Sequence, residues 1–169
     1  MQLNLPILHL LENSENILIA GAGGGFDIYA GLPIYFTLKE MGKNVHLANY
    51  SFMHFKLAKV LGDPIIEIDN VLIGARGQVK RDFAYYPEGF LAECFTEQDD
   101  DTVVWMIQGS AVPLVQKAYE RLIRKLNIDA IILVDGGVDS LMRGNESSPG
   151  SLLEDTISLA AIEEFDVPV

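Results

Sequence analysis

The chain of 169 residues is long enough for one domain with a sizeable core and too short for two domains of ordinary size. Its 24 acidic residues outnumber the 12 Lys and Arg residues, and the net charge of −12 argues against general binding to nucleic acid. No apolar run approaches the roughly 20 residues that cross a bilayer, and the first residues lack the pattern of a signal peptide, so we expect a cytoplasmic protein without a membrane partner.

Short apolar runs alternate with stretches of helical spacing along the chain. The runs 17–20 and 45–48 are predicted strands, and 31–43 between them has helical spacing, which makes one βαβ unit. The apolar runs 103–107 and 130–134 predict two further strands. Helices are also predicted at 52–61, 87–95, 110–127 and 152–165. The rest of the middle of the chain mixes short strands and glycines without a clear assignment.

Strands that are apolar on both faces and alternate with helices form parallel sheets covered on both sides. The predicted fold class is therefore α/β, a three-layer arrangement in which a mainly parallel sheet has helices on both faces. No internal repeat or low-complexity linker divides the chain, so residues 1–169 are predicted to form a single α/β domain.

A glycine-rich loop, GAGGGFD, follows the first predicted strand and precedes a helix. It offers four glycines and one acid as candidate ligand-binding residues: Gly21, Gly23, Gly24, Gly25 and Asp27. Such a turn places backbone N–H groups at the carboxyl edge of a parallel sheet, where anions and nucleotides bind. Phe26 stands where the dinucleotide fingerprint has its third glycine, which disfavours NAD. Asp27 either caps the helix or contributes a carboxylate to the site.

A second loop, DGGVDS, follows the strand predicted at 130–134. Its acids, Asp135 and Asp139, are candidate ligands for a divalent cation such as Mg²⁺, because carboxylates at the end of a strand suit that ion. The candidate ligand-binding residues of this region are Gly136, Gly137, Ser140 and Arg143. Arg143 is either an ion-pair partner within the acidic loop or an anion contact. The loop also resembles the S-G-G-x-D-S pyrophosphate loop of ATP pyrophosphatases, with Asp135 in place of the first serine.

Several other residues have structural interpretations. Cys94, the single cysteine, is expected to be buried, without a disulfide or a zinc site. Pro87 and Glu88 are expected to begin a helix. Glu154 and Asp155 are favoured in the first turn of a helix by its dipole, and the alternative is a role beside the acids of the second loop.

With these stretches in view, the chain resembles the family called domain of unknown function 1152. The resemblance is carried by GAGGGFDIYAGLPIYFTLKEMGKNVHLANYSF, YYPEGFLAECF, GSAVPLVQKAYERL, and VDGGVDSLMRGNE followed by LEDTISLAA. It implies a Rossmann-like α/β fold and leaves open that residues 1–169 are the N-terminal part of a longer family fold. It implies no particular activity.

The two loops together predict a site for a nucleotide or phosphorylated small molecule, with Mg²⁺ as the expected cation. Because both loops leave strands at the carboxyl edge, we expect them to face one cleft. Two alternatives stay open: a non-catalytic ligand-sensing or assembly module, and an ATP-pyrophosphatase-like enzyme that uses DGGVDS. No Ser/His/Asp or Cys/His set is apparent in the sequence, so catalysis and homo-oligomerisation also stay open.

Overall fold

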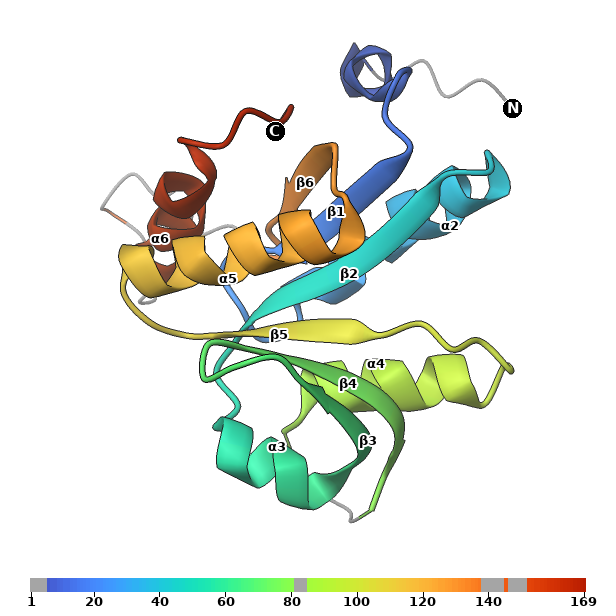
Figure 1. The fold of residues 1–169 in the computed structure, drawn as a ribbon, viewed down its shortest axis with the longest axis vertical. Coiled ribbons are helices and arrows are strands. Elements are labelled where there is room, and N and C mark those ends of the chain that lie inside the picture. Colours follow the sequence, from blue (N-terminus) through green and yellow to red (C-terminus); the bar gives the residue numbers. More distant parts are fainter. Residues whose placement is uncertain (1–5, 81–84, 138–144, 146–151) are drawn as a thin grey trace.

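The computed structural model describes residues 6–80, 85–137, 145 and 152–169. These residues form a mixed α/β fold around one six-stranded sheet with the strand order β3-β4-β5-β2-β1-β6 (Figure 1). The strands are β1 Asn16–Gly21, β2 Asn44–Ser51, β3 Gly62–Glu67, β4 Leu72–Val79, β5 Val104–Gln108 and β6 Ala130–Val134. The helices are the 3-10 helix η1 Pro6–Leu11, α1 Asp27–Ala30, α2 Leu32–Glu40, α3 Phe55–Leu61, α4 Pro87–Thr96, α5 Val112–Leu126 and α6 Leu153–Ile162.

Four adjacent strands, β5, β2, β1 and β6, run parallel to one another. They are the strands that the sequence predicts at 45–48, 17–20, 103–107 and 130–134, so that prediction is confirmed. At the amino edge the carboxylate of Asp129, just before β6, accepts hydrogen bonds from Glu15 N at 2.8 Å and Asn16 N at 3.0 Å. This contact ties the start of β1 to the start of β6 and fixes their register.

The other two strands form an antiparallel pair that the sequence pattern does not assign. β3 pairs with β4, and β4 pairs antiparallel with β5, so the sheet is mostly parallel with an antiparallel edge. The connection between β3 and β4 is short, and Asp69 Oδ1 accepts hydrogen bonds from Val71 N and Leu72 N within it. A tight turn of this kind is the ordinary connection between antiparallel strands.

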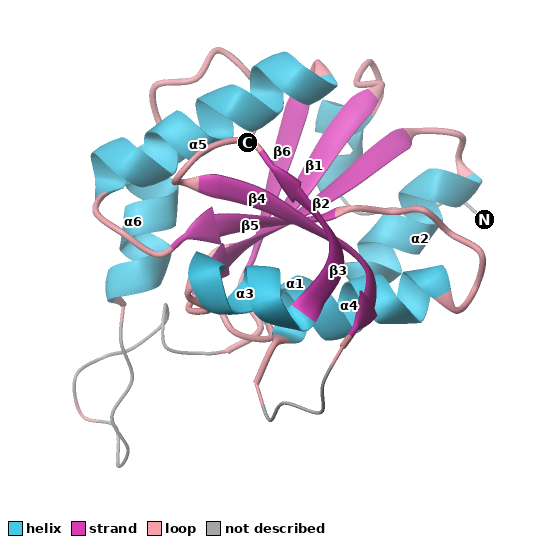
Figure 2. Cartoon of the chain, turned by 60° about the horizontal axis from the view of Figure 1, so that its bottom comes forward, coloured by secondary structure: helices cyan, strands magenta, loops and turns pink. Residues whose placement is uncertain are grey.

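The apolar side chains of the sheet pack into two clusters because successive side chains of a strand point to opposite faces. Ile17 and Ile19 of β1 lie in one cluster with residues of α1 to α4. Leu18 and Ala20 lie in the other cluster with residues of α5 and α6. Figure 2 shows α5 and α6 on one side of the strands and α3 and α4 on the other. The central strands are thus covered on both faces.

Two findings concern single features of the chain. Cys94 is exposed, so the expectation that it is buried is wrong. It lies on the outer side of α4, whose buried side includes Leu91 and Phe95. Among the helices of the described residues, none combines the length and the apolar content that a membrane span requires.

Candidate functional site

The two glycine loops lie side by side at the carboxyl edge of the sheet. β1 and β6 are parallel neighbours that end together, with Gly21 opposite Val134. Ala22 N donates a hydrogen bond to Val134 O at 2.9 Å. A Cβ added to Gly136 would lie 3.0 Å from the Cα atom of Asp27. The loop after β1 therefore touches the loop after β6.

Three carboxylates gather where these loops meet. Asp27, Asp135 and Asp155 each offer an oxygen atom, and these atoms all lie within 4.8 Å of one another. Asp27 is the first residue of α1, Asp135 follows β6, and Asp155 belongs to the first turn of α6. Asp155 is buried, whereas the other two side chains are half-buried. We call these three residues the carboxylate cluster. Its charges repel one another unless a cation offsets them.

The glycines allow these carboxylates to approach the backbone. Asp27 does not cap α1. Its Oδ2 atom instead accepts a hydrogen bond from Gly23 N at 2.8 Å. A Cβ added to Gly23 would lie 2.8 Å from Asp27 Oδ2 and 2.8 Å from Asp155 Oδ1, so a side chain cannot be placed there without displacing a carboxylate. Gly24 has a φ of +90°, which favours glycine.

Two buried polar residues, Asn49 and Glu88, lie against the backbone of the first glycine loop. Asn49, at the end of β2, is fully buried, and its Nδ2 donates to Gly25 O at 2.9 Å and to Glu88 Oε1 at 2.8 Å. Both amide hydrogens are thus used on acceptors, which fixes the orientation of the amide. Glu88 is 1% exposed, and its burial raises the pKa of its carboxyl group. Within the described residues, Glu88 Oε2 has no hydrogen-bond partner.

The structure therefore brings together most of the sequence-predicted site residues: Gly21, Gly23, Gly24, Gly25, Asp27, Asp135, Gly136 and Gly137. Gly137 N donates to Asp135 Oδ1 at 2.7 Å, which shapes the turn after β6. The candidates Asp139, Ser140 and Arg143 lie outside the described residues. Asp155 lies in the first turn of α6, as expected, and it also lies beside Asp135, as the alternative interpretation has it.

Neither Asn49 nor Glu88 is among the site residues that the sequence predicts. Glu88 is expected from the sequence only as part of a helix start. One signal was available, because Asn49 directly follows the strand predicted at 45–48 and is therefore next to the expected ligand edge. The burial of Glu88 is not visible in the sequence.

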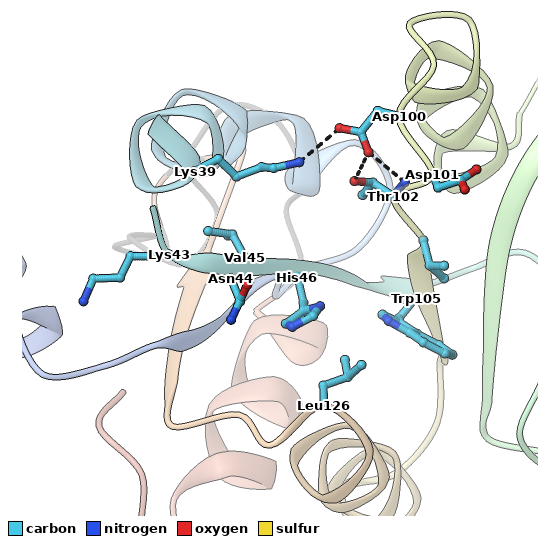
Figure 3. Close-up of a pocket in the computed structure, with 11 residues that line it drawn as sticks. Lys39, Lys43, Asn44, Val45, His46, Asp100, Asp101, Thr102, Trp105 and Leu126 are labelled. Atoms are coloured by element: carbon cyan, nitrogen blue, oxygen red, sulfur yellow. Dashed lines mark hydrogen bonds and ion pairs between the residues drawn. The ribbon is translucent and has the colours of Figure 1, made fainter. Parts of the chain in front are cut away.

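A separate cavity of about 400 Å³ opens at the opposite, amino edge of the sheet (Figure 3). Its charged side chains already form ion pairs: Lys39 Nζ lies 3.1 Å from Asp100 Oδ2 within the lining, and Lys43 and Asp101 pair with Glu15 and Arg76 outside it. Burial lowers the pKa of His46, which also lines this cavity. The lining offers no excess of either charge, so it does not single out a ligand.

Comparison with known proteins identifies a family but no activity. Neither the curated proteins nor the solved structures give a match. A family described as protein of unknown function (DUF1152) matches residues 86–169. This stretch is narrower than the resemblance in the sequence suggests, and it includes Glu88, Asp135 and Asp155 but not the first glycine loop. Through residues 86–169, the chain belongs to the DUF1152 family.

Proposed function

We propose that the chain binds a phosphorylated small molecule together with a divalent cation at the edge where β1 and β6 end. The observation that carries the proposal is the carboxylate cluster of Asp27, Asp135 and Asp155, which three separate segments of the chain bring together. Oxygen atoms of carboxylates are the ligands that Mg²⁺ takes in proteins, usually with water and phosphate oxygens completing the octahedron. Mg²⁺ is therefore the cation that we expect there.

The strand order supports this position. From β1 the chain passes through β2, β3, β4 and β5, which all lie on one side of β1, and it returns to place β6 on the other side. We interpret this as a Rossmann-like arrangement, in which ligands bind outside the carboxyl ends of the strands where the strand order reverses. That reversal lies between β1 and β6, where the cluster is.

The charge of the protein explains why a cation is needed. A chain with a net charge of −12 repels phosphate, and the cluster adds local negative charge. A bound Mg²⁺ would offset the cluster and attract the phosphate groups of the ligand. Asp155 would then share with Asp135 the task that the sequence analysis gives to Asp135 and Asp139.

The experiment is calorimetric titration of the purified protein with MgCl₂ and MnCl₂, followed by titration with inorganic tripolyphosphate with and without Mg²⁺. We expect cation binding by the wild type, and tripolyphosphate binding that depends on the cation. Asp155→Asn should lose both, whereas Asp166→Asn, a change at an exposed aspartate of the C-terminal segment, should lose neither. Equal cation binding by the wild type and Asp155→Asn would contradict the proposal. Release of phosphate over time would separate an enzyme from a sensing module.

A further inference from the structure

Aromatic side chains surround the first glycine loop on its solvent side. Phe26 and Phe52 are 53% and 52% exposed, and Tyr85 is partly exposed. A single exposed aromatic residue is ordinary on a protein surface. Here three such residues come from the loop after β1, the loop after β2 and the segment before α4, and they meet at Gly24 and Gly25.

The contacts define this arrangement, which we call the aromatic rim. A Cβ added to Gly24 would lie 2.9 Å from Phe52 Cε2, so the ring of Phe52 packs directly against the loop backbone. A Cβ added to Gly25 would lie 3.3 Å from the hydroxyl oxygen of Tyr85. The rings of Phe26 and Tyr85 stand edge to face, with their centroids 6.0 Å apart.

Buried residues hold the aromatic rim in place. Tyr50, 5% exposed, packs edge to face against Phe52 at a centroid distance of 5.7 Å. Asn49 fixes the Gly25 carbonyl at the other end of the rim. The exposed rings therefore do not depend on a ligand for their position, and they present apolar faces to solvent.

The rim also adjoins the carboxylate cluster. Burial raises the pKa of the Tyr85 hydroxyl, and the negative charges of Glu88 and Asp27 raise it further. The hydroxyl thus remains protonated at neutral pH. Gly23, whose N–H donates to Asp27 Oδ2, directly precedes Gly24, against which the ring of Phe52 packs. One end of a ligand could meet the cation while its other end meets the rings.

We infer that the ligand is a nucleotide, whose base stacks on the rings of Phe26 and Phe52 while its phosphates lie at the carboxylate cluster. This inference rests on the proposed function and narrows its ligand class. Stacking on aromatic side chains suits any base, because every base has a π-face. A compound with phosphates but no planar ring leaves the rim exposed to water.

The test compares ligands by calorimetric titration in the presence of Mg²⁺. The probes are the common ribonucleoside triphosphates, inorganic tripolyphosphate and ribose 5-phosphate. We expect at least one nucleotide to bind more than about tenfold more tightly than the two probes without a base, which corresponds to about 1.4 kcal/mol at 25 °C. Phe52→Ala should weaken nucleotide binding by about tenfold and leave tripolyphosphate binding unchanged.

Two further variants control for effects on folding. Phe52→Leu keeps apolar bulk against Gly24 and removes the ring, so it should weaken nucleotide binding nearly as much as Phe52→Ala. Phe36→Ala removes an equally exposed ring from α2, 48% exposed, and should change neither affinity. If tripolyphosphate or ribose 5-phosphate binds as tightly as every nucleotide, or if Phe52→Leu leaves nucleotide binding unchanged, the inference is wrong and the proposed function stands. If none of these probes binds with Mg²⁺, both are wrong.

Discussion

Replacing Asp27 with asparagine should stabilise the protein in a chelating buffer and remove most of its response to Mg²⁺. Two unit charges 4.8 Å apart repel each other by about 3.5 kcal/mol at an effective dielectric constant of about 20. Asp27 faces two such charges, those of Asp135 and Asp155. Because Asp27 and Asp135 are half-buried, solvent screens part of the repulsion, and we expect a gain of about 1–3 kcal/mol in unfolding free energy.

The change to asparagine removes the charge of Asp27 but keeps the shape of its side chain. Its amide oxygen can still accept the hydrogen bond from Gly23 N, so the turn of the loop is kept. Wild type should gain about 2.7 kcal/mol when Mg²⁺ is present at a hundred times its dissociation constant, and Asp27→Asn should gain much less. Wild type should therefore be the less stable protein in chelator and the protein that Mg²⁺ stabilises more.

Thermal unfolding with EDTA and then with MgCl₂ measures both effects, since 1 kcal/mol shifts the midpoint by about 2–4 °C in a chain of this size. Asp166→Asn removes an exposed acid and serves as the matched control, with no change expected in either buffer. The reasoning is refuted if Asp27→Asn destabilises the protein in EDTA and responds to Mg²⁺ as strongly as the wild type.

Three further predictions concern the support of the first glycine loop. Burial raises the pKa of the Glu88 carboxyl above its value in the unfolded chain, so the wild type loses stability as pH rises through that raised pKa. The melting temperature of Glu88→Gln should therefore rise relative to that of the wild type as pH increases. A constant difference between the two melting temperatures at every pH would contradict this. Asn49→Ala should lower the unfolding free energy by about 2–4 kcal/mol in urea titration, because the Gly25 carbonyl and the buried Glu88 carboxyl both lose their donor. Gly24→Ala should lower the unfolding free energy by about 2–3 kcal/mol, because its φ of +90° is unfavourable for alanine and the new Cβ would lie 2.8 Å from a carbonyl oxygen. Gly42→Ala, with a φ of +84° and nothing within 4 Å of the new Cβ, should lower it by only about 1 kcal/mol. Equal losses in the two variants would show that crowding at Gly24 is unimportant.

The sheet is predictable from the sequence where strands are buried on both faces. β1 and β6 are short apolar runs that lead into glycine-rich turns, and this pattern belongs to parallel strands buried on both faces. β3 and β4 are not assigned from the sequence, because charged residues such as Glu67 and Arg76 interrupt their apolar pattern. The antiparallel pair of strands is therefore apparent only in the structure.

Some residues of the candidate site are likewise predictable from the sequence, and others are not. Asp27 and Asp135 could be proposed because each lies in a glycine-rich turn that follows a strand: Asp27 comes two residues after Gly25, and Asp135 directly precedes Gly136. The place of Asp155 beside them depends on how α6 docks, and an acid in the first turn of a helix has an ordinary explanation in the helix dipole. The role of Glu88 depends on its burial against Asn49, which local sequence does not encode.

The hydrogen bond from Ser158 Oγ to the Ala22 carbonyl, 2.7 Å long, has a consequence for the order of folding. It joins residues 136 positions apart, and the carboxyl of Asp155 reaches the same loop from the same helix. Contacts of such long sequence separation form late, because a large part of the chain must be closed into a loop before they can be made. The turn after β1 should therefore gain amide protection only after α6 has docked, although β1 itself is among the first elements of the chain. In pulse-labelling hydrogen exchange, protection of Gly23 N should appear together with that of the α6 amides and later than that of β1.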